Sequence, residues 1–174
     1  RYDNGELSQA RDLYERGLGL ARTLSDRPAQ ILFLNNLAEY LLGCGEIEEA
    51  NPRVTEALQV SRDHGLTREE GLVLNALSAL ELKQGNESTA LEHAEAAMEI
   101  GYAIESRPLL AKAHLMRSQA LSHALYIAGI DDDDRHQEAS SSFKKAILLL
   151  EEMGDVPSLM RALDSYGRFL TERG

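Results

Sequence analysis

Five histidines are the side chains of this chain best suited to binding a metal ion or transferring a proton: His64, His93, His114, His123 and His136. A helical metal site of the H-E-x-x-H kind needs two histidines one turn apart on the same face. No two histidines here have that spacing. The histidines are scattered along the chain, so their pattern predicts no metal site.

The other groups capable of chemistry also lack partners. Cys44 stands between Gly43 and Gly45, where a small turn residue is the simpler interpretation than a redox thiol. The four aspartates 131–134 do not alternate with other residues around a central glycine, as the ligands of a calcium loop do. Carboxylates just before a helix accept its unpaired N–H groups, so we expect a helix cap there. Catalysis needs groups that converge on one point, and we predict a protein that is not an enzyme and has no cofactor.

Charge and composition narrow the possible partners. The 174 residues carry 18 lysines and arginines against 29 acids, a formal charge of −11. No basic run is present, which argues against nucleic acid as the main partner. No segment resembles a membrane span or a signal peptide. A single cysteine allows no internal disulfide and suits a reducing compartment, so we expect a cytoplasmic protein.

An internal repeat determines the expected architecture. Gly5, Gly45 and Gly85 lie at intervals of 40 residues, and each is followed five positions later by an alanine, at Ala10, Ala50 and Ala90. A fourth copy carries its alanine at 139, an interval of 49 residues, which indicates an insertion of nine residues within 125–134. A fixed period of this length is typical of stacked helical repeats.

A second periodic segment precedes each glycine. Apolar residues three, four and seven positions apart, beside a small residue, occur in L34-x-x-L37-A38, L74-x-x-L77-S78, a looser H114-x-x-R117-S118 and L163-x-x-Y166-G167. This spacing describes one face of a helix packed closely on another. Each unit is therefore predicted to be two antiparallel helices with a glycine turn. The eight expected helices span 6–24, 29–43, 46–64, 67–83, 86–103, 107–128, 135–153 and 156–172.

The small residues and the turn glycine resemble the tetratricopeptide repeat, in a long-helix variant with a period of about 40 residues. The resemblance covers essentially the whole chain and implies an all-α, right-handed α-solenoid. We expect one domain over 1–174, with units at 1–30 (second helix only), 31–70, 71–110, 111–159 with the insertion, and 160–174 (first helix only). Arg117 departs from the pattern because it occupies an expected leucine position. The large aromatic residue that often opens the first helix of the family is also absent, and Leu34, Leu74, His114 and Leu163 stand in its place. The chain begins and ends on unpaired helices, so we expect a fragment of a longer protein.

The first helices of successive pairs line the concave side of such a solenoid. Positions off their packing stripe are expected to face a common groove: Asn35, Asn36 and Glu39, then Leu72, Asn75, Ala79 and Lys83, then Lys112, Leu115, Met116 and Gln119, then Arg161, Asp164, Ser165 and Arg168. The resemblance implies that asparagines there hold the backbone of an extended ligand, since an amide offers both a donor and an acceptor. In the C-terminal half of the groove the cations outnumber Asp164, which favours an acidic partner segment.

The sequence thus predicts a scaffold that binds a protein or peptide segment, within an intracellular signalling or regulatory protein. Two alternatives stay open. One is a sensor module that binds a small anionic effector, and the other is a structural spacer that self-associates. Leu163, Tyr166, Phe169 and Leu170 are expected to be only half covered, which would allow homo-oligomers through the terminal helices.

Overall fold

The computed structural model describes residues 4–128 and 132–171, with side chains described for 9–126 and 132–171. Within these ranges the chain is all-α, and no strand is present. The eight helices are α1 (Asn4–Thr23), α2 (Arg27–Cys44), α3 (Ile47–Asp63), α4 (Thr67–Gln84), α5 (Glu87–Ala103), α6 (Arg107–Ala128), α7 (Asp133–Met153) and α8 (Val156–Thr171). The prediction of eight helices is confirmed, and each boundary lies within two residues of the expected one.

Glycines in the left-handed conformation end three of the helices. Gly45, Gly85 and Gly154 have φ angles of 81°, 80° and 68°. A side chain at these angles is strained, whereas glycine adopts them readily and lets the next N–H groups reach the last carbonyls of the helix. Two of the three repeated glycines of the sequence, Gly45 and Gly85, therefore let the chain reverse between two helices, whereas Gly5 lies within α1.

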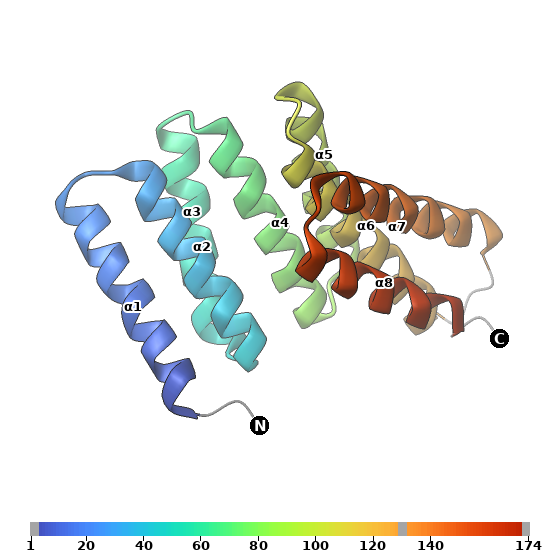
Figure 1. Ribbon diagram of the computed structural model, residues 1–174, viewed down its shortest axis with the longest axis horizontal. Helices are drawn as coiled ribbons and strands as arrows, with labels where there is room; N and C mark the ends of the chain where they lie inside the picture. The colour runs from blue at the N-terminus through green and yellow to red at the C-terminus, as the bar shows by residue number, and fades with distance from the viewer. Residues whose placement is uncertain (1–3, 129–131, 172–174) are drawn as a thin grey trace.

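Short turns join α1 through α6 in succession, and another joins α7 to α8 (Figure 1). Each helix packs on the next, and in addition α2 contacts α4, α4 contacts α6, and α6 contacts α8. The repeated alanines allow this close approach: Ala50, Ala90 and Ala139 have no exposed surface. The hydroxyl of Ser78 donates to the carbonyl of Ala90 over 2.8 Å, which ties α4 to α5.

Helix α6, next to the insertion, is longer than the equivalent helices of the other units. This helix has 22 residues, whereas α2 and α4 have 18 each. Asp132 then caps α7, because its carboxylate accepts the backbone N–H of Arg135 over 3.0 Å. The expected cap is thus confirmed for Asp132, while Asp131 lies outside the described residues. No cluster of three potential metal ligands occurs in the described part of the chain.

Aromatic rings fix α8 on α7. The rings of Phe143 and Tyr166 stack with centroids 5.1 Å apart, and Phe169 lies 5.6 Å from Phe143. Phe169 is consequently only 7% exposed, so the prediction that it is half covered is wrong. Leu163 and Leu170 are 49% and 55% exposed, as expected for the outer side of this helix.

Candidate functional site

A groove with a cavity volume of about 420 Å³ lies between α6, α8 and the C-terminal end of α7. Its floor is mainly apolar and comprises Ala111, Leu115, Met116, Leu150 and Met153. Its rim is polar and includes Glu39 from α2, together with Lys112, Gln119, Asp155, Ser158, Arg161, Asp164, Ser165 and Arg168. A narrow apolar floor with a few polar groups around it is typical of ligand sites.

Most of the sequence-predicted polar site residues meet in this groove. Of the nine, the structure brings together Glu39, Lys112, Gln119, Arg161 and Arg168. They come from α2, α6 and α8, which are all first helices of their pairs. The helical periodicity placed these side chains on the correct face of each helix. Their convergence follows from the contacts of α6 with α4 and α8.

The remaining predicted residues lie elsewhere, and Asn75 is a correction. Its side chain is fully buried, and its Nδ2 donates to the carbonyl of Leu109 over 3.5 Å, so it joins α4 to α6 and is not open to a ligand. Asn35 is half-buried and donates to Glu39 over 3.2 Å. Asn36 and Lys83 do not line the groove.

Charges in the groove are balanced, which contradicts the expected excess of cations. Three cations, Lys112, Arg161 and Arg168, face three acids, Glu39, Asp155 and Asp164. Lys112 forms an ion pair with Glu39, and Arg168 forms one with Asp164 on the next turn of α8. The prediction failed because Asp155 was not counted among the groove residues, and because Glu39 reaches across from α2.

Arg161 is the cation of the groove that forms no ion pair within the described residues. Its guanidinium donates to the hydroxyl of Ser158 over 3.1 Å. Ser158 also holds Asp155, since its backbone N–H donates to that carboxylate over 3.1 Å. Hydrogen bonds from the side chain and backbone of Ser158 lower the pKa of Asp155, and the positive charge of Arg161 lowers it further. The carboxylate is therefore ionised at neutral pH and stabilises the start of α8.

A second cavity, of about 820 Å³, lies between α5 and α7. We call it the α5–α7 cleft; its lining includes His114 and Arg117 of α6. At 100° per residue, these two side chains leave α6 on the side opposite to Lys112, Leu115 and Gln119 of the groove. The cleft and the groove therefore lie on opposite sides of α6.

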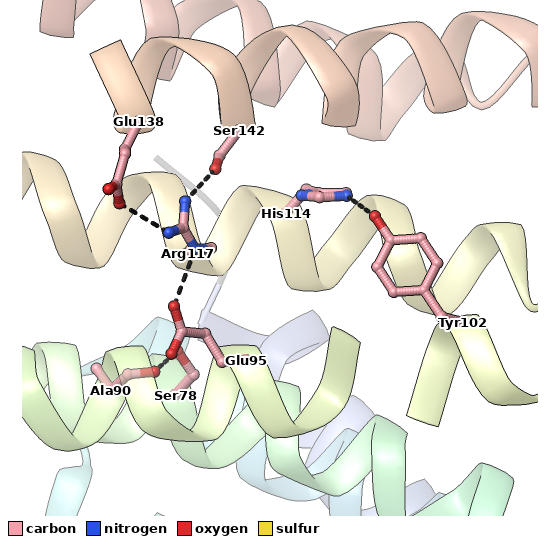
Figure 2. A network of polar contacts seen from close by, with 8 residues as sticks. All are labelled: Ser78, Ala90, Glu95, Tyr102, His114, Arg117, Glu138 and Ser142. Carbon is pink, nitrogen blue, oxygen red and sulfur yellow. Dashed lines mark hydrogen bonds and ion pairs between the residues drawn. The ribbon is translucent and has the colours of Figure 1, made fainter. Parts of the chain in front are cut away.

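Arg117 connects both walls of the cleft (Figure 2). Its guanidinium donates to Glu95 of α5 over 3.1 Å, to Glu138 of α7 over 2.8 Å and to the hydroxyl of Ser142 over 2.9 Å. His114 is 3% exposed, and its Nε2 lies 3.1 Å from the hydroxyl of Tyr102. Sequence reasoning missed this cleft, although the departure of two neighbouring repeat positions from the apolar pattern was the signal that could have found it.

Burial lowers the pKa of His114 to about 4, and the positive charges of Lys145 and Arg117 act in the same direction. The imidazole is therefore neutral at physiological pH. Its Nδ1 is buried and has no hydrogen-bond partner among the described residues. A buried polar atom without a partner costs stability, so this histidine is not explained by packing alone.

No protein-family model matches the chain, and no match was found among curated proteins. In the described residues, no helix is long and apolar enough to cross a membrane.

Proposed function

We propose that this chain is a non-catalytic scaffold that binds a segment of another polypeptide in the groove beside α6 and α8. The observation that carries the proposal is the groove itself, in which an apolar floor is surrounded by polar side chains from different helices. Such a site accepts an apolar side chain on its floor while the rim forms hydrogen bonds to the backbone of the ligand.

Gln119 and Arg161 are the rim residues best suited to the ligand. The amide of Gln119 offers both a donor and an acceptor, and within the described residues it makes a single long hydrogen bond, of 3.5 Å, to the hydroxyl of Ser165. Arg161 has no carboxylate partner in the described residues, so its guanidinium is available for a carboxylate of the partner. The preferred segment therefore carries an apolar residue near one acidic group. A strongly acidic segment is not favoured, because the groove has no excess of positive charge.

The wider role of the chain is proposed from the resemblance of its repeats to tetratricopeptide repeats. Small residues at the helix contacts and a glycine at the turns are the features on which that resemblance rests. Repeats of this kind serve as binding modules in larger proteins. On this basis we propose a scaffold within a cytoplasmic signalling or regulatory protein.

Self-association is the second candidate function, and the outer side of α8 favours it. Val156, Met160, Leu163 and Leu170 are between 49% and 65% exposed. Their spacing of four, three and seven residues places them along one side of the helix. An exposed apolar stripe of this kind is typical of a surface that another protein covers.

Selection from a random peptide library tests the proposed function. Peptides are selected on the wild-type protein alone, and the affinity of each is then compared with its affinity for Gln119→Trp, in which a bulky ring fills the groove. The affinity of each selected peptide is then measured by calorimetry for Arg161→Gln and for the matched control Lys83→Gln. The proposal predicts a loss of affinity of about tenfold for Arg161→Gln and none for Lys83→Gln. Peptides that bind the Gln119→Trp variant as tightly as the wild type would contradict it.

A further inference from the structure

Two residues that line the α5–α7 cleft, His114 and Arg117, can be compared with the residues at the equivalent positions of the other repeat units. His114 stands where the equivalent positions of the other units have Leu34, Leu74 and Leu163. Leu34 and Leu74 are buried in the core. Arg117 likewise stands where the other units have Leu37, Leu77 and Tyr166. Two apolar positions of the repeat are thus replaced by polar residues in one unit only, and both replacements line the same cavity.

Acids are arranged in pairs on both walls of the cleft. Glu95 and Glu99 are four residues apart on α5, and Asp134 and Glu138 are four residues apart on α7. Like charges at this spacing are neighbours on a helix surface and repel one another. In each pair one acid, Glu95 or Glu138, forms an ion pair with Arg117.

The other acid of each pair is available to a ligand. Within the described residues, Glu99 and Asp134 form no ion pair. Lys145 is the second cation of the lining, so the cleft has four carboxylates against two cations. The walls therefore already hold one guanidinium, that of Arg117, and retain negative charge for a further cation.

The apolar part of the cleft suits the stem of a long basic side chain. Met98 and Tyr102 lie on the α5 wall, and Tyr102 is 55% exposed. An aromatic face attracts a cation, and a thioether packs well against methylene groups. His114 at the base adds a nitrogen, Nδ1, which no described residue satisfies. Asn35 and Asn75 also have a buried oxygen without a partner among the described residues, but of the three only His114 lines the cleft, where a bound donor would supply the missing hydrogen bond.

We propose that the α5–α7 cleft is a second binding site, separate from the groove, which takes a lysine or arginine side chain of a basic segment of a partner protein. Charge complementarity carries this assignment, because the cleft is negatively charged and the whole chain has a formal charge of −11. Such a field also speeds the approach of a basic partner. The groove and the cleft would then bind different segments on opposite sides of α6.

Titration with a single arginine residue tests this site. The probe is N-acetyl-arginine amide, and the control is N-acetyl-citrulline amide, which has nearly the same shape but no charge. Amide spectra of the full chain are recorded with each compound at millimolar concentration. We expect saturable shifts at Glu99, Tyr102, His114 and Glu138 with the arginine compound only.

Two variants and a matched control assign the effect to the cleft. Glu99→Gln and Asp134→Asn each remove a carboxylate that pairs with no cation in the part of the chain that the structure describes, and each is expected to weaken binding about two- to fivefold. Glu92→Gln removes an exposed acid of α5 that does not line the cleft, and it should leave the affinity unchanged. The proposal is overturned if no saturable shifts occur in the cleft, if citrulline amide shifts the same residues equally, or if Glu92→Gln weakens binding as much as the other two.

Discussion

Replacing His114 by leucine should remove much of the loss of stability that the protein shows as the pH falls. The folded protein keeps this histidine neutral down to a pKa of about 4, while the unfolded chain protonates it near 6.5. Protons therefore bind preferentially to the unfolded state between these values. The contribution of this group to the free energy of unfolding is greatest at neutral pH, falls as the pH drops below 6.5 and levels off below 4.

The size of this effect follows from the two pKa values of His114. One pKa unit corresponds to about 1.4 kcal/mol, so the wild type should lose roughly 2.5 kcal/mol between pH 7 and about pH 4.5 through this residue. The groups facing the imidazole are Tyr102 of α5, Lys145 of α7 and Arg117 of α6 itself. Both cations disfavour protonation of the imidazole.

Urea unfolding at a series of pH values measures the effect. The variants are His114→Leu, which restores the residue found in the other units, and His114→Gln, which stays polar but does not titrate. Both should lose about 2.5 kcal/mol less than the wild type between pH 7 and pH 4.5. The burial of His93 also lowers its pKa, but this contribution is common to all three proteins. Equal pH dependence in the wild type and both variants would refute the reasoning.

Three further predictions concern packing and association. Arg117→Leu should destabilise the fold by roughly 0.5–2 kcal/mol in urea unfolding, because the half-exposed carboxylates of Glu95 and Glu138 lose their shared cation. Additional Glu95→Gln and Glu138→Gln changes should recover part of the loss, and no recovery would refute the ion-pair explanation. Ala90→Leu should lower the free energy of unfolding by about 1–3 kcal/mol through overpacking. The control Ala103→Leu, at an exposed site, should change it by less than about 0.5 kcal/mol. If α8 mediates self-association, light scattering will show a mass that rises with concentration for the wild type and a constant monomer mass for Leu163→Glu; a wild-type monomer at every concentration would remove this second candidate function.

The helices were predictable because each signal is local. The glycine turns, the small residues at helix contacts and the apolar spacing depend on neighbours within about one helical turn, so the boundaries agree with the structure to within two residues. The cap at Asp132 was predictable for the same reason, since it rests on a carboxylate directly before a helix.

The sites were only partly predictable because they depend on how the helices pack. Periodicity assigned Asn75 to the face that lines the groove, but α6 covers this side chain in the structure. Glu39 reaches Lys112 across 73 positions of sequence, and this acid together with Asp155 removes the excess of positive charge expected in the groove. Finding the α5–α7 cleft required both the comparison of repeat units and the structure, because an arginine at an apolar repeat position could equally have pointed to solvent.

The four methionines of the chain allow the most direct test of where a peptide binds. Met116 and Met153 line the groove, Met98 lines the α5–α7 cleft, and Met160 lies on the exposed side of α8. Benzophenone reacts preferentially with methionine, so a library-selected peptide that carries this group labels the nearest one under light. Mass spectrometry of the cross-linked protein then identifies the labelled residue. Binding in the groove predicts label on Met116 or Met153, whereas label confined to Met98 or Met160 would contradict it.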